Sequence, residues 1–564
     1  MRGRAKPWRG LGSWMVAGAA FAALAVTLQG ESPALRTSIE PTAIGKAPSS
    51  AAEPASRVLG REVAVERHLQ DGEEFELSTA ELIAHGRHLF TARWTAQEGA
   101  GRPLSKGTGA PLSDLSVPLE FPHNFHRLSG PDANACSGCH NQPFGIPGGS
   151  GDVVTNAFVL AQRFDRLDFD PADEQPIVSS RDESGRLVTL STAGNFRSTP
   201  GLFGAGYVEM VARAMTRDLQ RIRDAIPLGG SAELKARGVS FGVLRRIEDG
   251  RFDTSRVTGL LPASLASFGG YDDPPSLVIR PFHQGGGVTS LREFTNNALN
   301  HHHGIQSSER FGRGADPDGD GFADEATRGD VTALVMYQAT LAVPGRVIPR
   351  QREVERAVQQ GEQVFAQIGC TSCHVPSVRL RREETRFIEP GPWNGDLHLQ
   401  EEDAPPLVVD LGAEDLPAPR LAVEDGWVDV PVYSDFKLHL LTDGESDPNH
   451  EPVDMNQPAG LMRFFDGNGR FMTRRLWGVG NQPPYFHHGK FTTLREAIGG
   501  HGGEGAESRA AFDRLEAGEQ AALIEFLKSM QVLPPGSTAR IVDEKGRPRP
   551  WPPAGDGAAT TEAP

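Results

Sequence analysis

All four cysteines of this 564-residue chain lie in two copies of the pattern Cys-x-x-Cys-His. In each copy two thiols can add to the two vinyl groups of one haem, while the imidazole of the next residue reaches the iron from the same side. A zinc site is the alternative, but zinc needs its ligands close together and residues 141–369 separate the copies. We therefore predict two covalently bound c-type haems. Their attachment points and ligands are Cys136, Cys139 and His140 in the first copy and Cys370, Cys373 and His374 in the second.

The N-terminus has the composition of an export signal. Several basic residues precede an apolar, alanine-rich stretch at residues 11–28. Export agrees with haem c attachment, which takes place outside the cytoplasm. An uncleaved anchor is the alternative, because about 17–25 apolar residues can span a bilayer. We predict that residues 1–30 are a signal or anchor and that the protein lies in the periplasm.

Chain length and composition indicate a globular protein with more than one core. The formal net charge of −16 argues against a nucleic-acid partner. A stretch rich in Ala, Pro, Ser and Glu, without periodicity, predicts a disordered linker. We expect this linker at residues 31–72, an N-terminal haem domain at 73–346, a C-terminal haem domain at 350–536 and a flexible tail at 537–564.

The segments around the two motifs repeat each other. Ahead of each motif a glycine stands one helical turn before a phenylalanine, at Gly86 and at Gly361. Apolar residues at helical spacing follow, at residues 329–337 and 518–526. An opening helix, the motif and a closing helix are typical of cytochrome c folds. The pattern predicts a mainly α protein with two cytochrome c-like haem domains, long loops and a few short strands.

Another motif is similar to the calcium loop of an EF-hand. Asp316, Asp318, Asp320 and Asp324 occupy positions one, three, five and nine, and a glycine occupies position six. Position twelve lacks the usual glutamate, so Glu325 would have to substitute. Calcium binding is one interpretation of this segment, and a solvated acidic turn is the other.

Four further segments carry a resemblance to a known family. They read GPDANACSGCHNQP, RSTPGLFGAGYVE, LNHHHGIQSSERFG and LWGVGNQPPYFHHGKFTTLREAIGGHGGE. Together with the two haem motifs, they resemble the bacterial di-haem cytochrome c peroxidase superfamily, and within it the branch of di-haem peroxidases and di-haem oxidoreductases. The resemblance covers residues 80–535, and its C-terminal segment is the most specific part.

The resemblance implies different roles for the two haems. The C-terminal haem of such enzymes relays electrons, and counting from His487 leads to His501 as its sixth ligand, where methionine is usual. A second imidazole should lower the potential of this haem. Peroxide reacts at the N-terminal haem. Asn156 stands where related enzymes carry the histidine that blocks this haem at rest. Either the site on the His140 haem is open, which we expect, or a distant histidine closes it.

The resemblance also suggests which groups move protons during peroxide cleavage. The family's glutamate follows a leucine, and a strict register places Arg292 at that position, whereas a shift of one residue places Glu293 there. His302, within the triplet 301–303, and Glu209 are further candidates. The triplet could equally be a histidine-rich helix end, and Glu209 a buried structural anion.

These observations predict a periplasmic di-haem c-type oxidoreductase of the peroxidase type. Hydrogen peroxide would be reduced at the haem on His140, with electrons that a small redox protein donates through the haem on His374. One alternative is haem-dependent oxidation of an organic or protein substrate. The other is an electron-transfer cytochrome without catalysis. Membrane contact is expected only through the N-terminal segment.

Overall fold

The computed structural model describes residues 59–101, 125–130, 135–160, 194–266, 273–316, 320–395, 398–454, 456–457 and 466–552. The predicted export segment lies outside these ranges. Among the helices of the described residues, none combines the length and the apolar composition that crossing a membrane requires. The described residues fall within one compact unit, so the predicted boundary between two haem domains stays a prediction.

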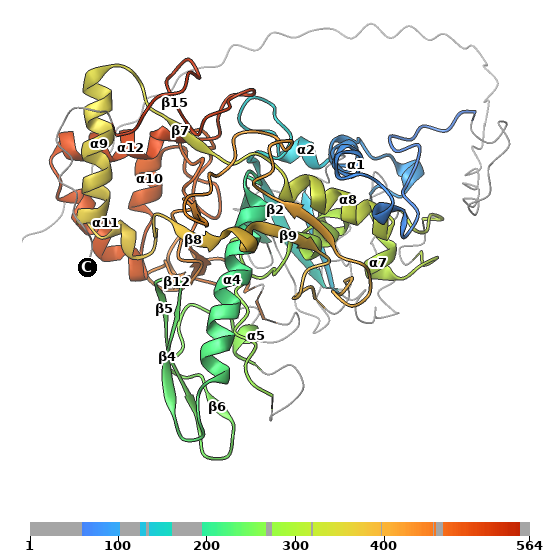
Figure 1. The fold of residues 1–564 in the computed structure, drawn as a ribbon, viewed down its shortest axis with the longest axis horizontal. Coiled ribbons are helices and arrows are strands. Elements are labelled where there is room, and N and C mark those ends of the chain that lie inside the picture. The colour runs from blue at the N-terminus through green and yellow to red at the C-terminus, as the bar shows by residue number, and fades with distance from the viewer. Residues whose placement is uncertain are drawn as a thin grey trace, which may run out of the picture. The chain divides into compact units, whose positions relative to one another are not determined.

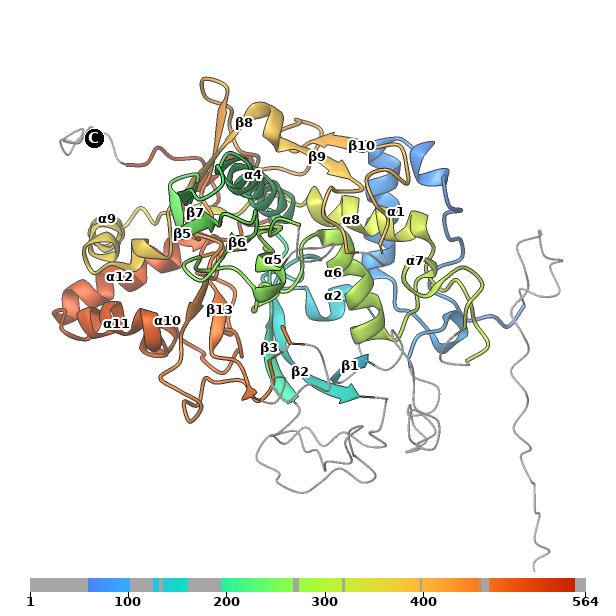
Figure 2. The same cartoon turned by 90° about the horizontal axis from the view of Figure 1, so that it is seen from below.

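Two helix pairs stand at opposite ends of this unit (Figures 1 and 2). Helix α1 (Thr79–Thr91) packs against α8 (Arg328–Ala339), close to the first haem motif. Helix α9 (Arg352–Gln367) packs against α12 (Ala517–Ser529), close to the second. The predicted opening and closing helices are thus confirmed.

Glycine allows each pair to approach closely. A Cβ at Gly86 would lie 1.9 Å from the carbonyl oxygen of Ala333 in α8. A Cβ at Gly361 would lie 2.0 Å from the carbonyl oxygen of Ala522 in α12. The phenylalanine that follows each glycine then reaches the haem motif. The ring centroids lie 6.0 Å apart for Phe90 and His140, and 6.2 Å apart for Phe365 and His374.

The other helices are mostly short. The exception is α4, which runs between the two helix pairs (Figure 2). Its Gly206 faces the carbonyl oxygen of Ala339 at the end of α8. The helices are α2 (Cys136–Cys139), α4 (Ala205–Asp224), α5 (Pro262–Leu265), α6 (Leu291–Ala298), α7 (Ser308–Phe311), α10 (Leu494–Gly499) and α11 (Ala506–Asp513), with a π-helical turn η4 (Leu299–His303) and 3-10 turns η2 (Glu73–Phe75), η3 (Ala96–Glu98), η5 (Cys370–Ser372), η6 (Arg382–Thr385) and η8 (Gly503–Gly505).

The prediction of a mainly α fold is wrong. Helices make up 33% and strands 17% of the confident regions, and the strands form six small sheets in the described part of the chain. The physical reason is that several segments expected to be loops alternate buried and exposed residues, and these pair locally as antiparallel strands. The sheets are β1 (Phe125–Gly130), β2 (Gly151–Leu160) and β3 (Gly194–Thr199); β4 (Ser231–Ala236), β5 (Val239–Arg246) and β6 (Phe252–Asp253); β14 (Met530–Gln531), β7 (Gly345–Val347) and β15 (Ile541–Val542); β8 (Val378–Arg381) and β11 (Trp427–Val430); β9 (Arg386–Glu389) and β10 (Leu407–Asp410); and β12 (Leu438–Leu440) and β13 (Arg470–Met472).

The described residues contain a large and a small hydrophobic core. The small core lies between α9 and α12 and includes Phe365, Leu523 and Phe526. The large core surrounds α4 and α8, and strands β8 to β11 contribute to it although they follow the second motif in the chain. Strands β8 to β11 therefore pack with the part of the molecule that holds the N-terminal haem motif.

We predict that Gly361→Ala destabilises the protein, because its methyl group must displace backbone of α12. Overpacking of this kind costs about 1–3 kcal/mol or more. Thermal unfolding measures the effect. Gly518→Ala is the matched control in the partner helix, since a Cβ there meets no atom within 4 Å. Gly518→Ala should leave the free energy of unfolding unchanged or raise it by up to about 1 kcal/mol. Equal melting temperatures for the two variants would contradict the proposed role of Gly361.

Candidate functional site

The first motif forms helix α2 and presents His140 from a tightly folded loop. A Cβ at Gly151 would lie 1.6 Å from the carbonyl oxygen of Cys139, so the chain after the motif turns back directly beneath it. The Nδ1 of His140 donates to the carbonyl oxygen of Gly149 at 3.0 Å. Burial lowers the pKa of His140 to about 4. The side chain is therefore a neutral imidazole whose Nε2 is left for a metal.

The second motif repeats this arrangement on different elements. Cys370 and Cys373 flank the turn η5, and His374 donates from Nδ1 to the carbonyl oxygen of Tyr433 at 3.0 Å. Burial again lowers the pKa of His374 to about 4. A carbonyl that takes the Nδ1 proton fixes the tautomer and the ring orientation of a metal-binding histidine. Both motif histidines have this property.

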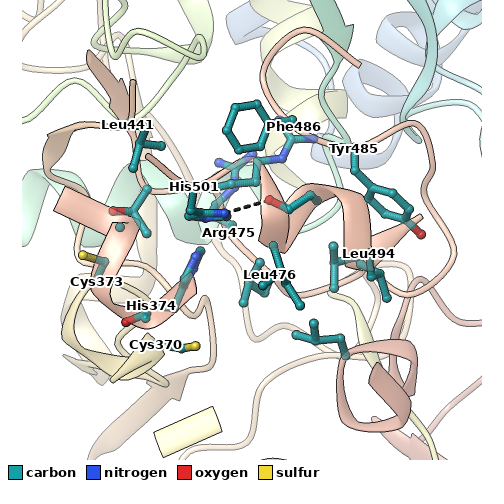
Figure 3. A pocket seen from close by; sticks show the side chains of 18 of the residues that line it. Cys370, Cys373, His374, Leu441, Arg475, Leu476, Tyr485, Phe486, Leu494 and His501 are labelled. Carbon is teal, nitrogen blue, oxygen red and sulfur yellow. Dashed lines mark hydrogen bonds between the residues drawn. The ribbon is translucent and has the colours of Figure 1, made fainter. Parts of the chain in front are cut away.

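His501 faces His374 across one cavity (Figure 3). The ring centroids lie 6.5 Å apart with an interplanar angle of 63°. Two imidazoles on opposite sides of one metal ion, each bonded at about 2.0 Å, have centroids about 6 Å apart. His501 donates from Nδ1 to the carbonyl oxygen of Ala497 at 2.8 Å, which leaves its Nε2 for the metal. The pair therefore fits the two axial positions of one haem iron.

The loop that carries His501 is held on both sides. Gly502 donates its N–H to the carbonyl oxygen of Leu441 at 3.0 Å, and Gly503 donates to Asp443 Oδ1 at 2.8 Å. Glu504 accepts from the N–H of Leu440 at 3.0 Å. A glycine-rich loop would otherwise be free to adopt many conformations. These contacts position His501 in the cavity.

Two arginines supply positive charge to the same cavity. Arg474 and Arg475 line it, and neither forms an ion pair with any residue that the structure describes. Burial lowers their pKa values to about 10 and about 9. The Nη1 of Arg475 is buried without a hydrogen-bond partner. Buried cations call for anions, and the two propionates of a haem are the anions that this cavity fits.

His439 also lines this cavity but cannot bind iron. Its Nε2 bonds to Asp435 Oδ2 at 2.8 Å and its Nδ1 bonds to Glu504 Oε2 at 2.7 Å. Burial lowers the pKa of His439, but the hydrogen bonds of its ring, above all the one to Asp435, raise the pKa to about 11. A doubly protonated imidazole has no lone pair for a metal. Asp435, His439 and Cys373 lie together, but the motif assigns the Cys373 thiol to haem attachment.

The first cavity differs from the second in its axial groups. Phe90 packs on one side of His140, and no described histidine ring is paired with His140 as His501 is with His374. His283, His302 and His303 line the cavity. Of the described residues that line it, none is an aspartate or a glutamate. The polar side chains that line this cavity are therefore imidazoles together with one arginine, Arg197, and several hydroxyl and amide groups.

Helix α6 and the turn η4 determine which predicted residues reach this cavity. Phe294, Ala298 and His302 follow one another at helical spacing and all line it. His303 lies at its edge, with Nε2 3.5 Å from Cys136 Sγ. Of the four predicted proton-transfer residues, His302 is therefore the one that lines the cavity beside the first haem motif. His283, in the loop that precedes α6, is a further histidine that lines this cavity. The sequence did not single it out as a site residue.

The structure places the other three predicted catalytic residues elsewhere. Arg292 is fully buried and donates to Glu309 Oε2 at 2.7 Å and to Glu389 Oε1 at 2.8 Å. Despite burial, these carboxylates hold the pKa of Arg292 above its usual range. Glu293 Oε2 accepts from Thr289 at the start of α6. These side chains leave α6 on faces turned away from the cavity.

Glu209 is likewise a structural anion. It pairs with Arg213 one helical turn away, and its other oxygen accepts the N–H of Leu291 at 2.8 Å. Its side chain is 1% exposed. It thus links α4 to the start of α6 and does not line the first cavity. The interpretation of Glu209 as a buried structural anion fits these contacts.

The described carboxylates of the acidic loop accept hydrogen bonds from backbone N–H groups of the same loop. Asp316 accepts the N–H of Asp320 and of Gly321, at 3.2 and 3.0 Å. Asp324 accepts the N–H of Gly314 at 2.9 Å, and Asp318 lies outside the described residues. Glu325 is buried and accepts the N–H of Gln306, so it is turned away from the loop. Calcium binding at Asp316, Asp318, Asp320 and Asp324 stays a prediction.

The comparisons with known proteins agree with the two haem motifs. The family described as "Di-haem oxidoreductase, putative peroxidase" matches residues 255–385 and 428–530. By this match the chain is similar to the di-haem oxidoreductases, and the resemblance predicted from its motifs is confirmed. The family implies two haems. No curated protein matches the chain.

Two solved structures give distant matches. The first is hydrazine synthase of Kuenenia stuttgartiensis, pressurised with xenon, at 15% identity and a TM-score of 0.24, covering 57% of this chain and 87% of that chain. The second is a MauG-like protein associated with microbial copper homeostasis, at 16% identity and a TM-score of 0.21, covering 46% of this chain and 75% of that chain. Similarity at this level carries no argument about function.

Proposed function

We propose that this di-haem oxidoreductase is a periplasmic c-type enzyme that reduces hydrogen peroxide at the first cavity. The difference between the two cavities carries the proposal. The second cavity has two opposed imidazoles, His374 and His501, which would saturate an iron. In the first cavity no described histidine ring is paired with His140 as His501 is with His374. An open haem suits reaction with a small ligand, and a saturated haem suits electron transfer.

Reduction of hydrogen peroxide consumes two electrons and two protons and yields two waters. A haem held by His140 would supply the electrons that break the O–O bond. The protein must move a proton from the oxygen near the iron to the far oxygen. We assign this step to His302, because an imidazole can both accept and donate a proton and this one lines the first cavity. His140 would hold the first haem from the opposite side.

Electrons would come from a small redox protein through the second haem. The thioether bonds of the second haem would form at Cys370 and Cys373, and Arg474 and Arg475 would hold the propionates of this haem. Two imidazole ligands favour ferric iron more than an imidazole and a thioether do. The donor should therefore have a lower potential than the usual donors of methionine-ligated relatives.

A second candidate function is the oxidation of an organic or protein substrate at the first cavity. The opposed pair His374 and His501 favours it, because a low-potential second haem is harder to reduce and better suited to stabilise oxidised states. The first cavity would then bind oxygen or peroxide as the oxidant, and the substrate would supply the electrons.

One preparation tests the proposal. Protein produced with haem c maturation should carry two haem masses, and its ferric spectrum should show a high-spin haem together with a low-spin haem. Peroxide should be turned over with a panel of reduced donor proteins. Two low-spin haems without peroxide turnover would contradict the proposal and favour an electron-transfer cytochrome instead. Peroxide-dependent oxidation of an organic compound, without turnover of any donor protein, would favour the second candidate.

A further inference from the structure

His439 bonds to loops on both sides of the second cavity. Its Nε2 donates to Asp435 Oδ2 at 2.8 Å, and its Nδ1 donates to Glu504 Oε2 at 2.7 Å. An ionised carboxylate can only accept, so both ring nitrogens carry a proton and the imidazole is charged. Its side chain is 10% exposed. Hydrogen bonds between charged partners are roughly twice as strong as neutral ones.

Asp435 belongs to the loop that holds His374. The carbonyl oxygen of Tyr433, two residues before Asp435, accepts from His374 Nδ1 at 3.0 Å. The other oxygen of Asp435, Oδ1, accepts from the hydroxyl of Thr473 at 2.7 Å. The carboxylate is buried and held from two directions. One bond of His439 is therefore anchored on the side of the cavity that carries His374.

Glu504 belongs to the loop that holds His501, three residues earlier in the chain. Its carboxylate bonds to two successive residues of β12, since Oε2 accepts from His439 and Oε1 accepts from the N–H of Leu440 at 3.0 Å. On its outer side Arg470 Nη1 lies 3.5 Å from Oε1, where both side chains are about half exposed. The second bond of His439 is therefore anchored on the side of the cavity that carries His501.

His501 depends on contacts of this kind to keep its place. The carbonyl oxygen of Ala497, which accepts from His501 Nδ1, lies one helical turn earlier in the same segment. That bond orients the ring but moves with the segment. Glycines occupy positions 499, 500, 502 and 503, and glycine gives a segment many accessible conformations. A charged bond between β12 and Glu504 fixes the segment against the cavity wall.

We propose that His439 is a positioning residue for the second haem. Its two carboxylate bonds join the loops of the two axial histidines and so keep His501 on the iron. The inference rests on the proposed function, because it requires a haem between His374 and His501. An axial position that stays filled excludes small ligands, so the reaction with peroxide stays at the first haem. Without this bridge the loop moves away more often, and the second haem opens to the same ligands.

Carbon monoxide on the fully reduced holoprotein tests the role of His439. It binds a ferrous haem with an open axial position, so the first haem should react in a fast phase. At the second haem it binds only after His501 has left the iron, which gives a slow phase. Stopped-flow absorbance resolves the two phases.

His439→Gln should accelerate the slow phase at least about tenfold and leave the fast phase unchanged. The reason is that an uncharged amide with one donor nitrogen cannot replace two hydrogen bonds to charged groups. Glu504→Ala removes the same bridge from its half-exposed end. It should accelerate the slow phase likewise, and it replaces His439→Gln in the comparison if that variant does not assemble.

Two variants are the matched controls. Arg470→Gln removes the exposed ion pair on the outer side of Glu504 and leaves His439 in place. His450→Gln makes the same change of side chain at a histidine that contacts Thr442 and does not line the cavity. Both should keep the wild-type slow phase, since exposed ion pairs contribute little.

The positioning role is overturned if removal of the bridge leaves the slow phase at the wild-type rate, or if Arg470→Gln accelerates it as much. Equal acceleration of both phases would also overturn it, because it indicates a general loosening of the structure. These results would leave the proposed function intact, since the wild-type protein would still show two phases. A wild-type protein that lacks the fast phase or the slow phase would refute the proposed roles of the two haems themselves.

Discussion

Replacing His501 with methionine should raise the midpoint potential of one haem and leave the other nearly unchanged. The rise should be on the order of 100 mV, within the range of about 0.8 V that axial ligands span in haem proteins. The reason is that a thioether donates less to ferric iron than an imidazole does. A spectroelectrochemical titration that resolves the two haems measures the effect. Its direction follows from the position of His501 opposite His374.

His501→Gly should convert the same haem from low-spin to high-spin. His488→Gln is the matched control, because His488 is a buried histidine of the neighbouring loop that bonds to Asn449 Oδ1 at 2.9 Å and does not line the cavity. It should keep the wild-type low-spin spectrum. A low-spin spectrum in both His501 variants would show that another group binds this iron. His439 would be a poor substitute, since both of its ring nitrogens are bonded to carboxylates.

Replacing His302 with glutamine should lower kcat/KM for hydrogen peroxide by about 10²–10⁴-fold, the usual contribution of a general acid–base group. The haem content should not change, because His302 is neither an attachment point nor a proximal ligand. Steady-state turnover with one donor protein measures the loss.

Two neighbouring residues provide the controls for His302. His301 is the adjacent histidine of the same turn and does not line the first cavity. Glu293 is the carboxylate that the family register suggested, and its oxygen is held by Thr289. His301→Gln and Glu293→Gln should change kcat/KM by only a few-fold. A large loss in the Glu293 variant with an unchanged His302 variant would reverse the assignment.

The sequence alone determined the parts of this protein that depend on local spacing. The two Cys-x-x-Cys-His motifs and the helices at Gly86 and Gly361 involve residues close together in the chain, while the count from His487 to His501 came from the family resemblance. Covalent chemistry and helix periodicity act over such distances. The structure accordingly shows both helix pairs and places His501 opposite His374.

Only the tertiary structure decided which side of each element faces a cavity. Arg292, Glu293 and His302 are equally plausible in the sequence, but packing on Glu309 and Glu389 turns the α6 arginine away from the first cavity. The sheet of β14, β7 and β15 and the contact between Gly201 and Arg475 join segments far apart in the chain. Such contacts depend on the summed packing of many side chains, and no local pattern of residues specifies them.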